Sequence, residues 1–317
     1  MADFLASIPS LLFSAIRLCT PILLAAEACA ITKKAGLLNM GAEGLMLISA
    51  LMGVLFSTWT QSALIGLICG VFFSVLVTVI ICFVSFDLKC DLNLTNISMN
   101  NVLIGGTVFI MYVVCGQKSV TAGILNSKTI PAVEIPIIKD IPVLGKILSG
   151  HNIMTYVSIL MIVIVWFLIS KTVLGLRIRS VGVNAQAAQS VGISPKRIYY
   201  ISYALSGLIS GLGGAYMSMG YLSWFARDMM GGRGFMAMAA MNIAGGEPLE
   251  TALNALLFAG AQALSIFVQK YHINADLILA FPYIFAVVLI TVLTLVKNKK
   301  EQKKKQLQIM ERGKMAE

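Results

Sequence analysis

The chain has 317 residues, of which 58 % are hydrophobic and 12 % are charged, and its mean hydropathy is +0.87. A soluble domain contains about 45–50 % apolar and about 25 % charged residues, so this chain has too little polar surface to fold in water. The composition excludes a disordered chain, a collagen and a disulfide scaffold. It predicts an all-α, polytopic bundle of membrane helices, because only helices or closed barrels satisfy the backbone in lipid.

Nine charge-poor stretches are candidates for membrane spans, each of which needs about 20 apolar residues. In chain order they are residues 9–32, 38–57, 62–86, 99–115, 152–174, 199–221, 231–246, 250–269 and 277–296. The seventh stretch is short and has glycines at both ends, so it either crosses the membrane or enters and leaves on one side. We therefore expect about nine spans, within a range of eight to ten, in a transmembrane domain of residues 1–296.

The orientation follows from the distribution of basic residues. The net charge is +10, and the tail 297–317 alone holds eight Lys/Arg and three Asp/Glu. With nine spans, the segments on the tail's side carry 16 Lys/Arg and those on the other side carry seven. Because basic residues stay in the cytoplasm, we predict a basic cytoplasmic tail, an external N-terminus, an extracytoplasmic loop at 116–150 and a cytoplasmic loop at 175–198.

Signatures of catalysis and of nucleotide binding are missing from the sequence. Gly145-Lys146 is followed by Ile147 rather than by Ser or Thr, so it forms no phosphate-binding loop. The chain has two histidines, and its six cysteines form no CxxC pair, which argues against a metal site. We predict that the chain is not an enzyme and binds neither metal nor nucleic acid, since topology already explains its basic charge.

A short helix is predicted within the cytoplasmic loop. Asn184 is a favourable N-cap, residues 185–191 are mostly good helix formers, and Gly192 is a suitable terminator. Ser194-Pro195 then resembles the cap and first turn of the next helix. The small alanines of this helix would let another protein approach closely, although an ordinary connecting helix would look the same.

This segment resembles the coupling loop of ABC-importer permeases, whose loose signature is E-A-A-x3-G. Here the pattern is Gln186-Ala187-Ala188-x3-Gly192, with Gln in place of Glu. The resemblance implies that this helix sits in a cleft of a cytoplasmic ATPase. The residues expected to contact the ATPase are Asn184, Gln186, Ala187, Ala188, Gly192 and Ile193.

Four other stretches resemble motifs of one permease family, in the order in which that family has them. Residues 38–44 resemble N-x-G-x-E-G, residues 206–215 resemble S-G-x2-A-G-x2-G-A with Ser210 in place of Ala, and residues 232–239 resemble G-x-G-F-x-A-[IM]-A, followed by Gly-Gly at 245–246. The family is the branched-chain amino acid, ribose and nucleoside permease group. The loop around 135–145 is most similar to its nucleoside and simple-sugar branch.

The resemblance implies a multi-subunit importer in the bacterial cytoplasmic membrane. Its expected partners are ABC ATPase subunits, a second homologous permease, an extracytoplasmic substrate-binding lipoprotein and membrane lipid. ATP and Mg²⁺ would be bound by the ATPases, and this chain would bind no cofactor. The expected cargo is a nucleoside. Two alternatives stay open, an importer of a simple sugar such as ribose and a self-sufficient secondary transporter coupled through buried acids such as Glu27 and Glu43.

Polar residues within the spans are candidates for the substrate pathway, since such residues are costly in lipid. They are Asn39, Glu43, Asn100, Asn101, Asn242, Asn254 and Gln262. Asn39 and Glu43 are expected one helical turn apart near the inner end of the second span, and neutral amides suit an uncharged, hydroxyl-rich ligand. Small residues expected to pack the sixth span closely against neighbouring helices are Ser206, Gly207, Ser210, Gly211 and Gly214.

Overall fold

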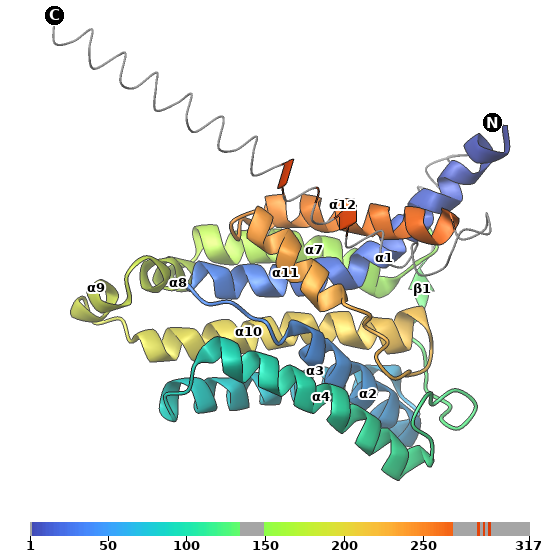
Figure 1. Ribbon diagram of the computed structural model, residues 1–317, viewed down its shortest axis with the longest axis horizontal. Coiled ribbons are helices and arrows are strands. Elements are labelled where there is room, and N and C mark those ends of the chain that lie inside the picture. The colour runs from blue at the N-terminus through green and yellow to red at the C-terminus, as the bar shows by residue number, and fades with distance from the viewer. Residues whose placement is uncertain (1, 134–148, 269–283, 286–287, 289–290, 293–317) are drawn as a thin grey trace, which may run out of the picture.

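The protein is seen here as a computed structural model that describes residues 2–133, 149–268, 284–285, 288 and 291–292 (Figure 1). The tail 297–317 and most of the predicted ninth span, 277–296, lie outside these residues. The described elements are α1 (Ala2–Lys34), α2 (Ala42–Thr60), α3 (Ala63–Cys82), the π-helix η1 (Phe83–Asp87), α4 (Leu92–Cys115), β1 (Ala132–Val133), β2 (His151–Asn152), α7 (Ile153–Lys171), α8 (Val173–Val183), α9 (Ala185–Ser190), α10 (Pro195–Ala215), the π-helix η2 (Tyr216–Tyr221), α11 (Arg233–Ile243) and α12 (Pro248–Val268).

Six of the described helices are long and apolar enough to cross a membrane. They cover Pro9–Lys34, Ala42–Thr60, Ala63–Asp87, Leu92–Cys115, Ile153–Lys171 and Pro248–Phe267. A helical, polytopic membrane protein is therefore confirmed, with β1 and β2 as a small antiparallel addition. The sixth predicted span corresponds to α10 and η2 together. The count of nine spans and the predicted orientation remain predictions.

The bundle has two distinct ends, which Figure 1 shows at opposite sides of the picture. At the α9 end, Lys34 pairs with Glu247, and Lys196 pairs with Asp87. At the other end, called the β end, β1 pairs with β2 and the 116–133 segment meets the 222–232 segment through the bridge between Val120 and Ala226. Basic residues 33, 34, 171, 177, 179, 196 and 197 all belong to helix ends or connections at the α9 end, the end predicted to be cytoplasmic.

The second span begins later than predicted. Residues 36–41 are not helical, and α2 starts only at Ala42. α1 ends at Lys34, and Gly36 has a φ of +81°, a left-handed conformation that turns the chain. The following residues run back into the bundle. Asn39 and Glu43 are therefore not one turn apart on one helix, which corrects that prediction. The connection is held by tertiary contacts, since Asn39 is fully buried and bonds to Ser206 in the middle of α10.

The fourth and seventh predicted spans also differ from the structure. α4 starts seven residues before position 99, because the Asp91 carboxylate accepts from the backbone N–H of Leu94 and caps it. α11 has only 11 residues, a rise of about 16 Å, against a bilayer core of about 30 Å. Between Ala226 at the β end and Glu247 at the α9 end, the chain combines a non-helical stretch with this short helix.

Small residues bring the backbones of α2, α3 and α10 into contact, and we call these three helices the α2–α3–α10 group. The hydroxyl of Ser74 on α3 donates to the carbonyl of Gly207, and that of Ser49 on α2 donates to the carbonyl of Gly211, both at 2.7 Å. A Cβ on Gly214 would lie 2.0 Å from the carbonyl oxygen of Met46. Such interlocking makes it difficult for one of these helices to move without the others.

Candidate functional site

The α9 tip, residues 183–194, projects from one end of the bundle in Figure 1. The Asn184 side chain accepts from the N–H of Ala187 at 3.0 Å and caps α9. Gly192 takes a φ of +85°, and Pro195 begins α10. These local features match the helix expected from the sequence. The tip thus joins α8 to α10 through one short, well-capped helix.

The predicted coupling residues divide into an outward set and an inward set. Asn184, Gln186, Ala187 and Gly192 are exposed. Ala188 is only 4 % exposed and packs in a cluster with Ile178, Val181 and Ile198. Ala188 therefore anchors the tip to the bundle, and Ile193 is partly buried against the same cluster. Contact of these two residues with an ATPase remains a prediction.

Two valines make the outer surface of the tip unusually apolar. Val183, which comes shortly before α9, is 88 % exposed, and Val191, directly after α9, is 76 % exposed. Gln186 and Ala187 lie between them and are also exposed. An exposed surface of small and apolar side chains at the end of a short helix suits insertion into a cleft of another protein.

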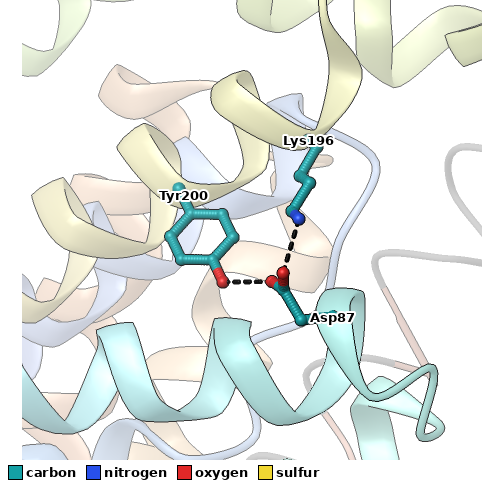
Figure 2. A network of polar contacts seen from close by, with 3 residues as sticks. All are labelled: Asp87, Lys196 and Tyr200. Carbon is teal, nitrogen blue, oxygen red and sulfur yellow. Dashed lines mark hydrogen bonds and ion pairs between the residues drawn. The ribbon is translucent and has the colours of Figure 1, made fainter.

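A polar cluster beside the tip connects η1, which continues α3, to α10, as Figure 2 shows. The Asp87 carboxylate accepts from the Lys196 ammonium at 2.6 Å and from the Tyr200 hydroxyl at 2.6 Å. Phe86 stacks on Tyr199 with a ring-centroid distance of 4.9 Å. Lys196 and Tyr200 lie in the first two turns of α10, directly after the tip, so a force on α9 would reach both α10 and α3.

A second site lies inside the bundle, where α2 and α11 begin, and we call it the α2–α11 joint. Glu43, in the first turn of α2, is 3 % exposed. Its Oε1 accepts from the N–H of Gly232 at 2.7 Å, and its Oε2 accepts from the N–H of Gly234 at 2.6 Å. The joint therefore brings together two of the motifs noted in the sequence, around residues 38–44 and 232–239.

Other residues of the 38–44 motif are fixed by α4 and α10. Asn96 on α4 donates to the carbonyl of Leu38 and to the Tyr203 hydroxyl, which itself donates to Leu38. A Cβ on Gly44 would lie 2.8 Å from the side-chain oxygen of Asn100. Sequence reasoning missed Asn96 and Tyr203, although the spacing of Asn96 and Asn100 by one helical turn on α4 could have revealed the first.

The remaining pathway candidates are not brought together. Asn101 and Asn242 are exposed on the surface of the chain. Asn254 is buried and donates to the carbonyl of Ala240, which ties α12 to α11. Gln262 is partly buried, and its side-chain oxygen has no hydrogen-bond partner among the described residues. Among the candidates, Asn39 and Glu43 belong to the 38–44 segment, and Asn100 lies beside Gly44 of the same segment.

The two acids considered for ion coupling differ in their surroundings. Both oxygens of Glu43 are occupied by backbone N–H groups of α11. Glu27, in α1, is fully buried, and neither of its carboxyl oxygens has a hydrogen-bond partner within the described part of the chain. The two acids therefore differ in whether their carboxyl oxygens have partners among the described residues.

Comparison with known proteins identifies the family of this chain. The family model for the permease component of branched-chain amino acid transport systems matches residues 11–296. The guanosine ABC transporter permease protein NupQ of Bacillus subtilis (strain 168) is 31 % identical over 288 residues, which cover 86 % of this chain and 88 % of NupQ. No solved structure was found to match the chain.

Two further relatives extend the comparison. The nucleoside ABC transporter permease protein NupC of Lactococcus lactis subsp. cremoris is 27 % identical, over 86 % of this chain and 88 % of NupC. The putative glucose ABC transporter permease protein TsgC13 of Haloferax volcanii is 26 % identical, over 84 % of this chain and 80 % of TsgC13. These matches confirm the prediction of a membrane permease rather than an enzyme. The chain belongs to the family of permease components of branched-chain amino acid transport systems.

Proposed function

We propose that this chain is one permease subunit of an ATP-driven importer in the bacterial cytoplasmic membrane, and that it moves a nucleoside. The α9 tip is the observation that carries the proposal, because it offers an exposed, small-residue helix at the end of a membrane bundle. Separate ATPase subunits would receive this tip and would hold ATP and Mg²⁺. A second permease and an extracytoplasmic lipoprotein would complete the importer.

The coupling path runs from the tip into the interior of the bundle. Movement of α9 displaces the first turn of α10, to which Lys196 belongs, and Asp87 passes the displacement to α3. Serine-to-glycine contacts between α10 and both α3 and α2 extend the moving part to the whole α2–α3–α10 group. Nucleotide-driven closure of the ATPases would thereby alternate the bundle between outward-open and inward-open states.

The α2–α11 joint favours an uncharged cargo. Transporters often use the N-terminus of a broken helix to bind an anionic group of the substrate. Here the N–H groups at the start of α11 are already occupied by the Glu43 carboxylate. A phosphate or carboxylate on the cargo would find this site filled and would meet a negative charge. A nucleoside fits this requirement, and the names of NupQ and NupC point to the same class.

The cargo can be identified by competition. In proteoliposomes containing the permeases, the ATPases and the lipoprotein, uptake of a labelled nucleoside should require ATP and should persist when protonophores collapse the proton gradient. An excess of unlabelled nucleosides should abolish uptake, whereas the nucleoside 5′-monophosphate should compete poorly. Competition by ribose or glucose instead would assign the importer to sugars. Uptake that needs a proton gradient and no ATP would establish the secondary-transporter alternative.

A further inference from the structure

The α2–α11 joint sets two helix N-termini close together inside the bundle. The first N–H groups of a helix have no partner within it, and this end carries a partial positive charge. The N-caps of α2 and α11 are Gly41 and Gly232. Because glycine has no side chain, neither residue can cap its helix with a side-chain hydrogen bond. Such an approach of like ends is unfavourable unless a negative group lies between them.

Glu43 supplies that negative group. Its two oxygens bond to two different N–H groups at the start of α11, while Glu43 itself belongs to the first turn of α2. Hydrogen bonds from N–H groups to an ionised carboxylate are about twice as strong as neutral ones. Gly234 permits the contact, since a Cβ there would lie 2.5 Å from the backbone nitrogen of Glu43.

The joint lies between two sets of helices, which also share contacts with α1. On one side, α2 is bonded to α10 through Ser49 and Gly211, within the α2–α3–α10 group. On the other side, α11 is bonded to α12 through Asn254 and packs against α1 around Cys29 and Met241. Glu43 is thus a polar link between the group moved by the α9 tip and the short helix α11.

We propose that Glu43 is a positioning residue of the transport cycle, which makes α11 follow the α2–α3–α10 group. This inference rests on the proposed function, because it requires that an ATPase moves the tip. When α10 and α2 shift, the two bonds to Gly232 and Gly234 carry the start of α11 with them. Without the carboxylate, the group would move while α11 lagged behind, and ATP would be hydrolysed without transport.

The decisive variant is Glu43→Gln in the assembled importer. Glutamine keeps the size of the side chain but turns an NH₂ donor toward an N–H donor, so one of the two bonds is lost. We expect the number of nucleosides transported per ATP hydrolysed to fall about tenfold, the loss expected for a buried hydrogen bond left unsatisfied. The matched control is Glu247→Gln, since Glu247 lies beyond the other end of α11 with its side chain 55 % exposed, and it should leave the ratio unchanged.

The ratio separates positioning from stability. A purely structural role would lower the amount of complex, and uptake and hydrolysis would fall in proportion. A normal ratio in Glu43→Gln would overturn the inference while the proposed function stood. Wild-type uptake without any requirement for ATP would instead overturn the proposed function itself.

A second measurement needs no change at Glu43. Single cysteines at Phe235 on α11 and at Leu208 on α10, both partly exposed, are introduced after replacement of the six native cysteines. Maleimide labelling is compared between the nucleotide-free importer and the vanadate-trapped one. We expect the labelling rates at both positions to change together. A change at position 208 with no change at position 235 would show that α11 does not follow α10, and would overturn the inference even if Glu43→Gln failed to fold.

Discussion

Gly214→Ala is expected to leave almost no folded permease in the membrane. The new methyl group would lie 2.0 Å from the carbonyl oxygen of Met46, and further atoms of Met46 lie within 2.8 Å. Backbone atoms cannot swing aside as a flexible side chain can, so α2 and α10 would have to separate. Overpacking of a core costs about 1–3 kcal/mol and occasionally more, and contact with a backbone atom places this case at the upper end.

The matched control is Gly105→Ala on α4. A Cβ at Gly105 meets nothing within 4 Å, and alanine is the better helix former by about 1 kcal/mol. Fluorescence-detected size exclusion of a fusion protein should show a normal monodisperse peak for this control and an aggregated or missing peak for Gly214→Ala. A normal peak and melting temperature for Gly214→Ala would contradict the backbone contact between α2 and α10.

Ala187→Arg is expected to abolish ATP-driven uptake while the chain itself folds normally. Ala187 is exposed between Val183 and Val191, so a long charged side chain there would prevent the tip from entering an ATPase cleft. Asn93→Arg is the matched control, because Asn93 is exposed in the first turn of α4. It should keep most of the uptake, whereas near-normal uptake by Ala187→Arg would argue against the tip as the coupling element.

Ala188→Arg would also lose uptake, but for another reason. Ala188 is packed against Ile178, Val181 and Ile198, so an arginine there would detach the tip from the bundle. The two neighbouring variants are separated by the stability of the purified chain, which should fall for position 188 and stay normal for position 187. This distinction required the structure, because the sequence motif treats both alanines alike.

The predictability of each element follows from where its determinants lie. The helix α9 was predicted almost to the residue, because Asn184, Gly192 and Pro195 are signals that act within a few residues. The helical start predicted at residue 38 was wrong, because the burial of Asn39 against α10 decides the path of that segment. The hydropathy of a segment does not predict a contact between residues that are 167 positions apart, as Asn39 and Ser206 are.

The short helix α11 shows the same limit more strongly. Its sequence is apolar enough to suggest a span, yet the helix begins only at Arg233. Gly231 and Gly232 have positive φ just before it, and its first N–H groups bond to Glu43, which lies 189 positions earlier in the chain than Gly232. Each motif could be recognised from the sequence, but nothing in either one indicated that they bond to each other. The interior site therefore emerged only from the fold.

The most direct measurement is site-specific photo-cross-linking from the α9 tip in cells that import the nucleoside. A benzophenone amino acid at position 187 should yield an adduct with an ATP-hydrolysing subunit, and the same group at the buried position 188 should yield far less. If position 187 captures no such subunit while import continues, this chain does not receive its driving force through the tip.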